Sequence, residues 1–528
     1  MRKNFLWILV GIVALAVGLQ IRLYPYFHNT SSDAYQKGKL VVVGNMQRML
    51  AQQVNAQFPN LPDVQKQALV MDKLNQVLHD HKDEINKAFD NAGKQIDAKD
   101  GDGQHYLQEI DSYYFLDLTE NILETGDVSD QVKGSRYFNR RMLAPLGFLE
   151  PQTWHPYVGA WVYKLIKLFD PKVDVMTAVG WTPLVLLPLV IAAFLFTLRV
   201  LGCSWQMAFI ASIFFVLAPV FLQRSSFGWY KNSIYLILFP LLSLGTAFAA
   251  LKHIENLKKS LLYGIACALS MAIFAMFWPG WGFVLALLGA SFVVIVITAF
   301  ITRQARLKNL LILGATTFVS CVVMVGFLFT WGLLFQSLSD SWGELIKFVV
   351  PHFKDWPDLF LIVSELKTSS PMDVINFIGH PVVIVIALVA LIYSSYAAVK
   401  AKRFFSDEIV ILSVFFLATF NLTLQAERFS ILALTPVILI FALGLEMIWG
   451  LRGQLKQSLQ KYYFLFLCLL IIVPIVLSQL NIRSYIVTIY NPAWDRAMIK
   501  LRDQTPPNSI VNTWWAPGHF IKAVARRS

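Results

Sequence analysis

One acidic stretch of the chain, Glu109–Gly126, combines residues that could carry out chemistry at the edge of a membrane. Asp111 and Ser112 precede three aromatic residues, Tyr113–Phe115, and leucine and isoleucine then recur at helical spacing. A carboxylate placed just before an amphipathic helix can hold a cation or stabilise a cationic transition state. The alternative is that Asp111 only caps the helix, since aspartate is a favoured N-cap residue. The stretch by itself leaves both interpretations open.

Further polar and aromatic residues that could belong to the same site lie in segments between apolar runs. These segments are Gln223–Ser233, Trp278–Gly282, the loop 336–373 with Asp355, Asp358 and Glu365, the pair Glu427–Arg428, and the segment 483–528. Asp, Glu, Lys and Arg are nearly absent from the centres of the apolar runs, where a transporter or channel would be expected to place ionisable residues. The pattern therefore favours chemistry at one membrane surface over ion conduction.

The composition is that of a polytopic membrane protein. The chain has 528 residues, of which 56% are hydrophobic and 15% charged, and its mean hydropathy is +0.55. These values are too apolar for a water-soluble enzyme. The net charge of +12 comes from Lys and Arg clustered in short loops, which membrane topology explains better than nucleic-acid binding. The four cysteines lie in or beside apolar runs and indicate buried thiols, with no disulfide framework or metal-ligand pattern.

Apolar runs of membrane-spanning length predict an all-α polytopic fold with about 11–13 transmembrane helices. The first run, from Phe5 to about Leu19, has no small-residue cleavage site after it and is interpreted as an uncleaved helix. The other runs lie near 176–198, 205–222, 233–251, 260–277, 283–301, 309–335, 374–398, 408–425, 429–450 and 462–482.

The runs predict five parts of the chain and an orientation in the membrane. The parts are a first transmembrane helix (1–21), an external helical insert (22–110), a first external loop with the Asp111 motif (111–175), a multi-span domain (176–482), and an external segment with two tryptophans (483–528) that we expect to start a missing or truncated C-terminal domain. The loops between spans alternate between a basic set and an aromatic or acidic set. Because basic loops stay inside, Asp111 is expected on the external or lumenal face.

Seven short motifs follow one another along the chain. They are Asp111–Phe115, His155–Val158 (after Gly126 and Arg136), Gln223–Tyr230, Trp278–Trp281, Ile362–Glu365, Glu427–Phe429 and Thr513–Gly518. In this order, and on the predicted outer face, they resemble motifs of the catalytic subunit of oligosaccharyltransferase, a polytopic enzyme of the GT-C type. The resemblance covers roughly residues 110–528.

This resemblance implies a GT-C-like fold and a set of roles for individual residues. The implied reaction transfers an oligosaccharide from a polyprenyl-(di)phosphate-linked donor to asparagine of an acceptor polypeptide. Asp111 and Glu365 would be the catalytic carboxylates, which accept N–H hydrogen bonds from the acceptor amide, and Arg428 would bind the donor diphosphate. Trp514 and Trp515 would belong to the acceptor-binding signature. The implied cofactor is Mg²⁺ or Mn²⁺ held by Asp111 and Glu365.

The sequence departs from the family's pattern at three positions. Lys231 and Ser233 stand where the family has an acid-x-acid motif, and a protonated lysine cannot ligate a metal. We therefore state the hypothesis that the Lys231 ammonium takes the metal's place and pairs with Asp111 and Glu365. Ala516 replaces the acid of the family's Trp-Trp-Asp signature, which calls a strict Asn-x-Ser/Thr acceptor preference into question.

The sequence leaves three alternatives to an active oligosaccharyltransferase. The first is a divergent GT-C glycosyltransferase with another acceptor, such as a lipid or a hydroxyl group. The second is a non-catalytic paralogue that binds lipid-linked glycan. The third is a transporter, which the lack of ionisable residues within the spans disfavours. In each case the protein is embedded in the lipid bilayer, and no nucleic acid is expected as a partner.

Overall fold

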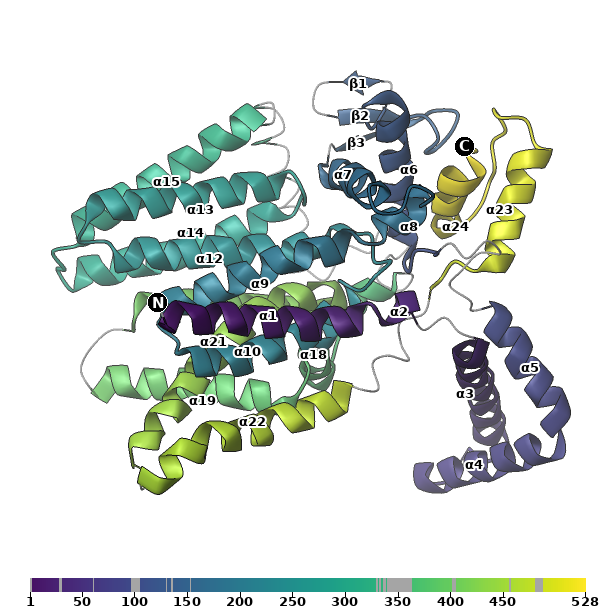
Figure 1. The fold of residues 1–528 in the computed structure, drawn as a ribbon, viewed down its shortest axis with the longest axis horizontal. Coiled ribbons are helices and arrows are strands. Elements are labelled where there is room, and N and C mark those ends of the chain that lie inside the picture. The colour runs from purple at the N-terminus through teal and green to yellow at the C-terminus, as the bar shows by residue number, and fades with distance from the viewer. Residues whose placement is uncertain are drawn as a thin grey trace.

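The structure is a computed structural model of the chain. It describes residues 2–27, 31–59, 61–95, 105–129, 131–133, 136–151, 153–328, 363–400, 405–454, 457–479 and 488–528, with four isolated residues between 331 and 339. Figure 1 shows three regions: a bundle of long helices, a cap of shorter elements at one end of it, and an arm of three helices beside the cap.

The bundle confirms the predicted all-α polytopic fold. Within the described residues, nine helical segments are long and apolar enough to cross a membrane. They contain α1 (Arg2–Arg22), α9 (Thr182–Leu201), α12 (Tyr235–Lys252), α13 (Leu257–Ala275), α14 (Trp281–Ile301), α15 (Leu307–Leu328), α19 (Pro381–Lys400), α20 (Asp407–Gln425) and α21 (Ser430–Gly450). The shorter α10 (Trp205–Leu217) and the 23-residue α22 (Gln457–Gln479) occupy two more of the predicted spans.

Three predicted spans are interrupted, which the apolar pattern does not reveal. The span expected near 176–198 divides into a short helix, Val175–Val179, and α9, with Gly180 and Trp181 between them. The span expected near 205–222 divides into α10 and α11 (Pro219–Gln223), and Pro219 is the first residue of α11. The span expected near 374–398 divides into α18 (Pro371–Ile378) and α19, with Gly379 between them at φ 139°. Proline lacks the N–H that a continuing helix needs but fits a helix start, and the φ of Gly379 favours glycine, so the breaks at Pro219 and Gly379 follow from local backbone chemistry.

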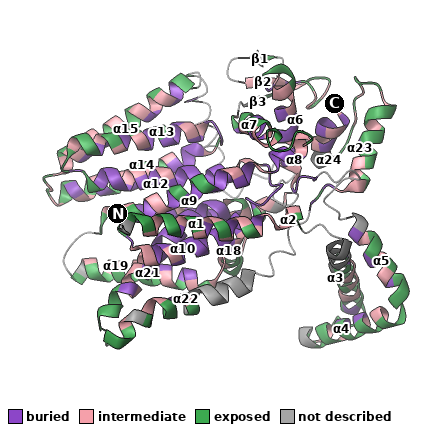
Figure 2. Ribbon diagram, in the orientation of Figure 1, coloured by how far each residue is buried: buried purple, intermediate pink, exposed green. Residues whose placement is uncertain are grey.

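The centre of the bundle is formed by α12 and α21. In the most apolar 18 residues of the spans that contain α12 and α21, 83% and 78% of the residues are buried. The corresponding share is 28% for α14 and for α15. Figure 2 shows the same contrast between inner and outer helices. Stacked aromatic rings such as Phe194, Phe215 and Phe221 fill the space between α9, α10 and α11. The outward faces of α14 and α15 are exposed and apolar, as expected for helices in contact with lipid.

The cap is built from segments that are far apart in the sequence. Its elements are α2 (Tyr24–Phe27), α6 (Ile110–Thr125), β1 (Val132–Lys133), β2 (Arg136–Asn139), β3 (Phe148–Pro151), α7 (His155–Lys167), α8 (Val175–Val179), α23 (Pro492–Gln504), α24 (Trp515–Phe520) and the π-helical turn η6 (Ile521–Ala525). The strands form an antiparallel sheet in the order β1-β2-β3, which the sequence analysis did not predict. Short 3₁₀ turns η1 (Asn232–Ile234), η2 (Ser364–Leu366), η3 (Glu427–Phe429) and η4 (Leu451–Gln454) lie at the ends of the bundle helices.

The arm consists of α3 (Ser31–Gln57), α4 (Asp63–Asp80) and α5 (Lys82–Gln95). It occupies the region for which an external helical insert was predicted. Helices α3 and α5 cross at Gly38, where an added Cβ atom would overlap the backbone of Phe89 and Gly93. A small apolar core that includes Val54, Val70 and Phe89 holds the three helices together.

Candidate active site

Asp111 lies in the first turn of α6, but it does not cap this helix. The N-cap residue is Glu109, whose side chain accepts a hydrogen bond of 2.9 Å from the backbone N–H of Asp111. The helix ends at Gly126, which adopts the left-handed conformation (φ 91°) that favours glycine. The interpretation of Asp111 as a simple cap is therefore wrong, because Glu109 fills that position and leaves the Asp111 carboxylate available for other contacts.

The Asp111 carboxylate pairs with Lys231, which lies immediately before η1. The Lys231 Nζ atom is 2.7 Å from Asp111 Oδ2, 3.7 Å from Glu109 Oε2 and 3.7 Å from Glu365 Oε1. Three carboxylates thus surround one ammonium group, whose side chain is only 15% exposed. The three segments that bring them together are more than 100 residues apart in the sequence.

The charges in this cluster shift the protonation of its members. Burial would lower the pKa of Lys231, but Asp111, Glu109 and Glu365 outweigh it and raise that pKa above its ordinary value. Burial would raise the pKa of Asp111, but Lys231 outweighs it and keeps that pKa below its ordinary value. Burial raises the pKa of Glu109 to about 7 against the opposing effect of Lys231. Lys231 is therefore a permanent cation, and Asp111 a permanent anion, near neutral pH.

Two arginines add positive charge on the Glu365 side of the cluster. Arg224 is buried, and its Nη2 atom lies 3.9 Å from Glu365 Oε1 while its Nη1 atom donates to the Arg428 carbonyl oxygen at 3.2 Å. Arg428 itself is exposed on η3. Burial would raise the pKa of Glu365, but Lys231 and Arg224, with a smaller contribution from Arg428, lower it. A buried guanidinium group thus lies at the edge of the carboxylate cluster and contacts the backbone of an exposed arginine.

The loop that carries Arg224 and Lys231 is fixed by α1 and by the segment before α6. Arg22, the last residue of α1, is fully buried; its Nε atom donates to Ser225 Oγ at 2.7 Å, and its carbonyl oxygen accepts from Phe227 N at 3.0 Å. The backbone of Gln108 pairs with Gly228 at 3.0 Å, and Gly228 has the left-handed φ of 87°. These contacts hold the loop in one conformation, so that Lys231 reaches Asp111.

Tyr230 anchors the same loop against α7. Its side chain is fully buried, and its hydroxyl group lies 2.6 Å from Thr119 Oγ1 on α6. A Cβ atom added to Gly159 on α7 would overlap this hydroxyl group.

We expect Gly159→Ala to destabilise the fold by about 1–3 kcal/mol and to reduce activity, because Tyr230 would have to move and displace Lys231. Gly450→Ala is the control, since an added Cβ atom there has no neighbour within 4 Å. Thermal unfolding compared between the two variants tests this, and equal midpoints would contradict it.

The carboxylates do not fit a divalent metal in the arrangement that they adopt. Mg²⁺ and Mn²⁺ are bound by several oxygen ligands that surround the position of the ion, and that position must be free of protein atoms. Here the position between Asp111 and Glu365 is filled by the Lys231 ammonium. Within the described part of the chain, no group of three or more His, Cys, Asp and Glu side chains is arranged to hold a metal ion. The geometry is the one that the lysine hypothesis requires.

The C-terminal segment lies against the same site. Trp514 is exposed, and the side chains of Trp515 and Ala516 lie outside the described part of the structure. One turn further on, His519 Nε2 is 4.0 Å from Asp111 Oδ1, and its ring packs edge-on against Tyr114. The segment with the two tryptophans is therefore next to Asp111, although 400 residues separate them.

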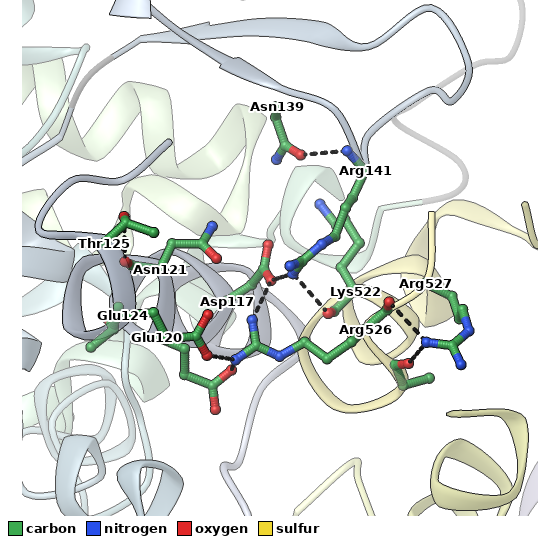
Figure 3. A network of polar contacts seen from close by, with 12 residues as sticks. Asp117, Glu120, Asn121, Glu124, Thr125, Asn139, Arg141, Lys522, Arg526 and Arg527 are labelled. Atoms are coloured by element: carbon green, nitrogen blue, oxygen red, sulfur yellow. Dashed lines mark hydrogen bonds and ion pairs between the residues drawn. The ribbon is translucent and has the colours of Figure 1, made fainter. Parts of the chain in front are cut away.

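A second polar cluster joins α6 to the C-terminal segment (Figure 3). Asp117 is buried and bonds to Arg141, which follows β2, and lies 3.8 Å from Arg526 Nη1. Arg526 Nη2 also pairs with Glu120 at 2.7 Å and with Glu124 at 2.9 Å. Because breaking a buried ion pair is costly, this cluster fixes the position of η6, and with it α24, relative to the helix that carries Asp111.

The structure brings together some of the predicted residues and adds others. Asp111, Lys231 and Glu365 form one cluster, and the Arg428 backbone contacts it through Arg224. Ser233 is not part of it: its hydroxyl group accepts from Trp229 Nε1 at 3.2 Å. Ile362, from the motif that ends in Glu365, lies outside the described residues.

Three members of the site were not predicted: Glu109, Arg224 and His519. Glu109 and Arg224 lie inside stretches that the sequence analysis singled out, but no spacing rule showed that their side chains turn toward Asp111 and Glu365. His519 directly follows the Trp-Trp motif, which was the one available signal.

The sequence matches a family model described as "Oligosaccharyl transferase STT3, N-terminal" over residues 97–489. It is 22% identical to a dolichyl-phosphooligosaccharide-protein glycotransferase of Methanococcus voltae, a match that covers 80% of this chain and 57% of the relative. It is 21% identical to the dolichyl-phosphooligosaccharide-protein glycotransferase 2 of Pyrococcus horikoshii, a match that covers 80% of this chain and 63% of the relative. The chain thus spans less than two thirds of the length of these relatives.

The fold is similar to that of the archaeal oligosaccharyltransferase AglB from Archaeoglobus fulgidus. The structure of that protein in complex with an inhibitory peptide and a dolichol-phosphate superimposes with a TM-score of 0.59 at 16% identity, over 80% of this chain and 60% of the other. The form in complex with Zn and sulfate gives a TM-score of 0.58 at 17% identity. This similarity confirms the predicted GT-C-like fold.

Proposed function

The chain belongs to the oligosaccharyl transferase STT3 family, and on that premise we propose that it transfers an oligosaccharide from a polyprenyl-(di)phosphate-linked donor to asparagine of an acceptor polypeptide. The observation that carries the proposal is the cluster of Asp111, Glu365 and Lys231, with Arg224 and Arg428 beside it, at one end of the bundle. In this reaction the carboxylates can accept hydrogen bonds from the acceptor amide, and the guanidinium groups can stabilise the negative charge of the departing diphosphate.

The carboxylates serve the acceptor. An amide nitrogen is a weak nucleophile, because its lone pair is delocalised into the carbonyl group. Asp111 and Glu365 are both ionised and can accept its two N–H hydrogen bonds, which turns the nitrogen toward the sugar and weakens the conjugation. In the transfer step the nitrogen forms a bond to the anomeric carbon, the bond from that carbon to the diphosphate oxygen breaks, and the displaced amide proton passes to a carboxylate of the site.

The arginines serve the leaving group. The departing lipid diphosphate gains negative charge as the glycosidic bond breaks, and a guanidinium group can donate two parallel hydrogen bonds to phosphate oxygens. Arg428 is exposed and can reach a bound donor, whereas Arg224 is buried and holds the backbone of Arg428 in place. We assign the direct contact with the diphosphate to Arg428.

Replacing Arg428 by glutamine is expected to raise the KM for the lipid-linked donor by about 10–100-fold, because a charge-assisted hydrogen bond to phosphate is lost. The KM for the acceptor peptide should change little. Arg452→Gln is the matched control, since Arg452 is an exposed arginine just beyond the other end of α21. Steady-state kinetics with each substrate varied in turn measures both constants. Equal effects of the two substitutions would contradict the assignment.

In our proposal, Lys231 supplies the positive charge between Asp111 and Glu365. The related protein from Archaeoglobus fulgidus is described in complex with Zn and sulfate. In this chain the ammonium group lies within ion-pair distance of all three carboxylates of the cluster. It would hold Asp111 and Glu365 close together in their ionised forms, which two carboxylates alone would resist because like charges repel. The Mg²⁺ or Mn²⁺ implied by the family resemblance would then not be needed.

The distribution of basic residues supports an orientation in the membrane. The chain is an integral multi-pass membrane protein, and Lys and Arg gather in the loops at the end of the bundle away from Asp111, as in the 301–308 turn between α14 and α15. Basic loops remain on the cytoplasmic side. We propose that the site opens on the external or lumenal face.

The test is transfer by the purified protein in lipid nanodiscs, with a labelled polyprenyl-linked oligosaccharide and a peptide that contains asparagine. The proposal expects a glycopeptide whose sugar is attached to the asparagine nitrogen, identified by mass spectrometry. Glycan on a lipid or hydroxyl acceptor instead would establish a different acceptor. Binding of the donor without any product would identify a non-catalytic protein and overturn the proposal.

A further inference from the structure

A large apolar cavity lies within the bundle, on the side formed by α12, α13, α14 and α15. Its volume is about 430 Å³. Among the described residues that line it, Thr317 is the only one with an oxygen in its side chain. Gly289 faces open space, since an added Cβ atom would have no neighbour within 4 Å. The cavity does not touch Asp111, Lys231 or Glu365.

The cavity begins near the end of the bundle opposite the active site and extends past the middle of the helices. Its lining extends from Leu311 to Cys321 on α15 and from Leu285 to Ile297 on α14, which at 1.5 Å per residue is about 15 Å and about 18 Å. It also reaches Leu251, in the last turn of α12, and Ile411, in the second turn of α20. These residues lie at the end of the bundle that is opposite the active site.

The cavity opens sideways toward the surrounding lipid. Val293 and Ile297 on α14, and Leu311 and Phe318 on α15, line it and are exposed on the outer surface of the bundle. Water does not fill such a space, because it offers no set of polar partners. A hydrocarbon chain can enter through this opening without leaving the membrane interior.

Positive charge surrounds the end of the bundle that the cavity reaches. Lys258 and Lys259 at the start of α13, Arg303 after α14 and Lys308 at the start of α15 are all exposed there. Arg306 lies among them and pairs with Asp407 at 2.9 Å. Glu255 and Glu408 are also near Arg306, so the four exposed cations outnumber the acids that have no such ion pair. A lipid whose chain fills the cavity would place its head group among these cations, and they favour an anionic one.

We propose that this cavity binds one acyl chain of an anionic phospholipid in the leaflet opposite the active site. The length of about 18 Å along α14 fits an extended acyl chain that enters from that side, and the cations fit its phosphate. The proposal does not depend on glycan transfer. It assigns the lipid the role of filling the space between α14 and the closely packed pair α13 and α15, because α14 packs little against either of them.

The proposal is tested on the full-length protein in nanodiscs of phosphatidylcholine with and without phosphatidylglycerol. Native mass spectrometry is expected to show one phosphatidylglycerol that stays bound when other lipids are stripped, and thermal unfolding is expected to shift upward with phosphatidylglycerol only. Gly289→Trp fills the cavity and should weaken retention by at least about tenfold and remove the shift. Gly289→Leu, a smaller change, should give an intermediate result if the tryptophan variant does not fold.

The matched control is Leu262→Trp, because Leu262 is an exposed residue of α13 that does not line the cavity. It should retain phosphatidylglycerol as the unmodified protein does. Equal retention in both tryptophan variants would overturn the site. Retention of phosphatidylcholine to the same extent would overturn the assignment of an anionic head group. A bound polyprenyl phosphate in place of the phospholipid would show that the cavity belongs to the donor and would also overturn the proposal.

Discussion

Replacing Lys231 by methionine is expected to lower the rate of glycan transfer by about a thousandfold, because it removes the cation from a site of three carboxylates. Methionine keeps most of the volume of the lysine side chain, so packing changes little. Without the ammonium group, Asp111, Glu109 and Glu365 repel one another, and at least one of them must move or take up a proton. Asp111 and Glu365 would then no longer both accept hydrogen bonds from the acceptor amide. Initial rates of glycopeptide formation measure the effect.

Lys367→Met is the matched control for this substitution. Lys367 is an exposed lysine two residues after Glu365, on the same side of the bundle. Exposed charges contribute little to stability or to the field inside a site, so this variant should transfer glycan at nearly the normal rate. If Lys231→Met and Lys367→Met have similar activities, Lys231 is a surface charge without a role in transfer.

Replacing Asp111 by asparagine is expected to lower kcat by about 10²–10⁴-fold, the range for a lost catalytic acid or base. The amide has nearly the same shape as the carboxylate, but it cannot accept hydrogen bonds as strongly or take up a proton. The KM values should change less than kcat, because Asp111 acts mainly as the amide nitrogen attacks the sugar. Its loss should also lower the stability of the protein, because Lys231 loses its nearest partner, at 2.7 Å.

The control for Asp111→Asn is Glu124→Gln, on the same helix. Glu124 is an exposed acid near the end of α6 and pairs with Arg526 rather than with Lys231. Its substitution should leave kcat within about threefold of the unmodified protein. A similar fall in kcat for both variants would mean that any lost charge on α6 disturbs the fold, and that Asp111 has no special part in transfer.

Hydropathy and loop charges were sufficient to predict the bundle, because a helix in lipid must satisfy its own backbone and therefore appears as a long apolar run. The helix breaks at Pro219 and Gly379 leave no mark in the hydropathy, because the runs stay apolar where the helix stops. The β1-β2-β3 sheet was also missed. Its strands have only two to four residues and therefore show no alternating pattern.

The active site could be predicted only in part. Asp111, Lys231, Glu365 and Arg428 were found through the order of motifs, since no periodicity relates residues that are more than 60 positions apart. The pairing of Lys231 with Asp111 depends on a loop whose conformation is set by Arg22 and Gly228. The roles of Glu109, Arg224 and His519 depend on such backbone details as well, which explains why composition and spacing did not reveal them.

The most direct test of our account is the dependence of transfer on divalent metal. Transfer by the unmodified protein should persist in EDTA, within about twofold of the rate with Mn²⁺, because Lys231 supplies the positive charge between Asp111 and Glu365. A variant, Lys231→Asp, should lose transfer in EDTA and recover it with Mn²⁺, because a carboxylate then replaces the ammonium group among Asp111, Glu109 and Glu365. Unmodified protein that is inactive in EDTA and restored by Mn²⁺ would contradict the account.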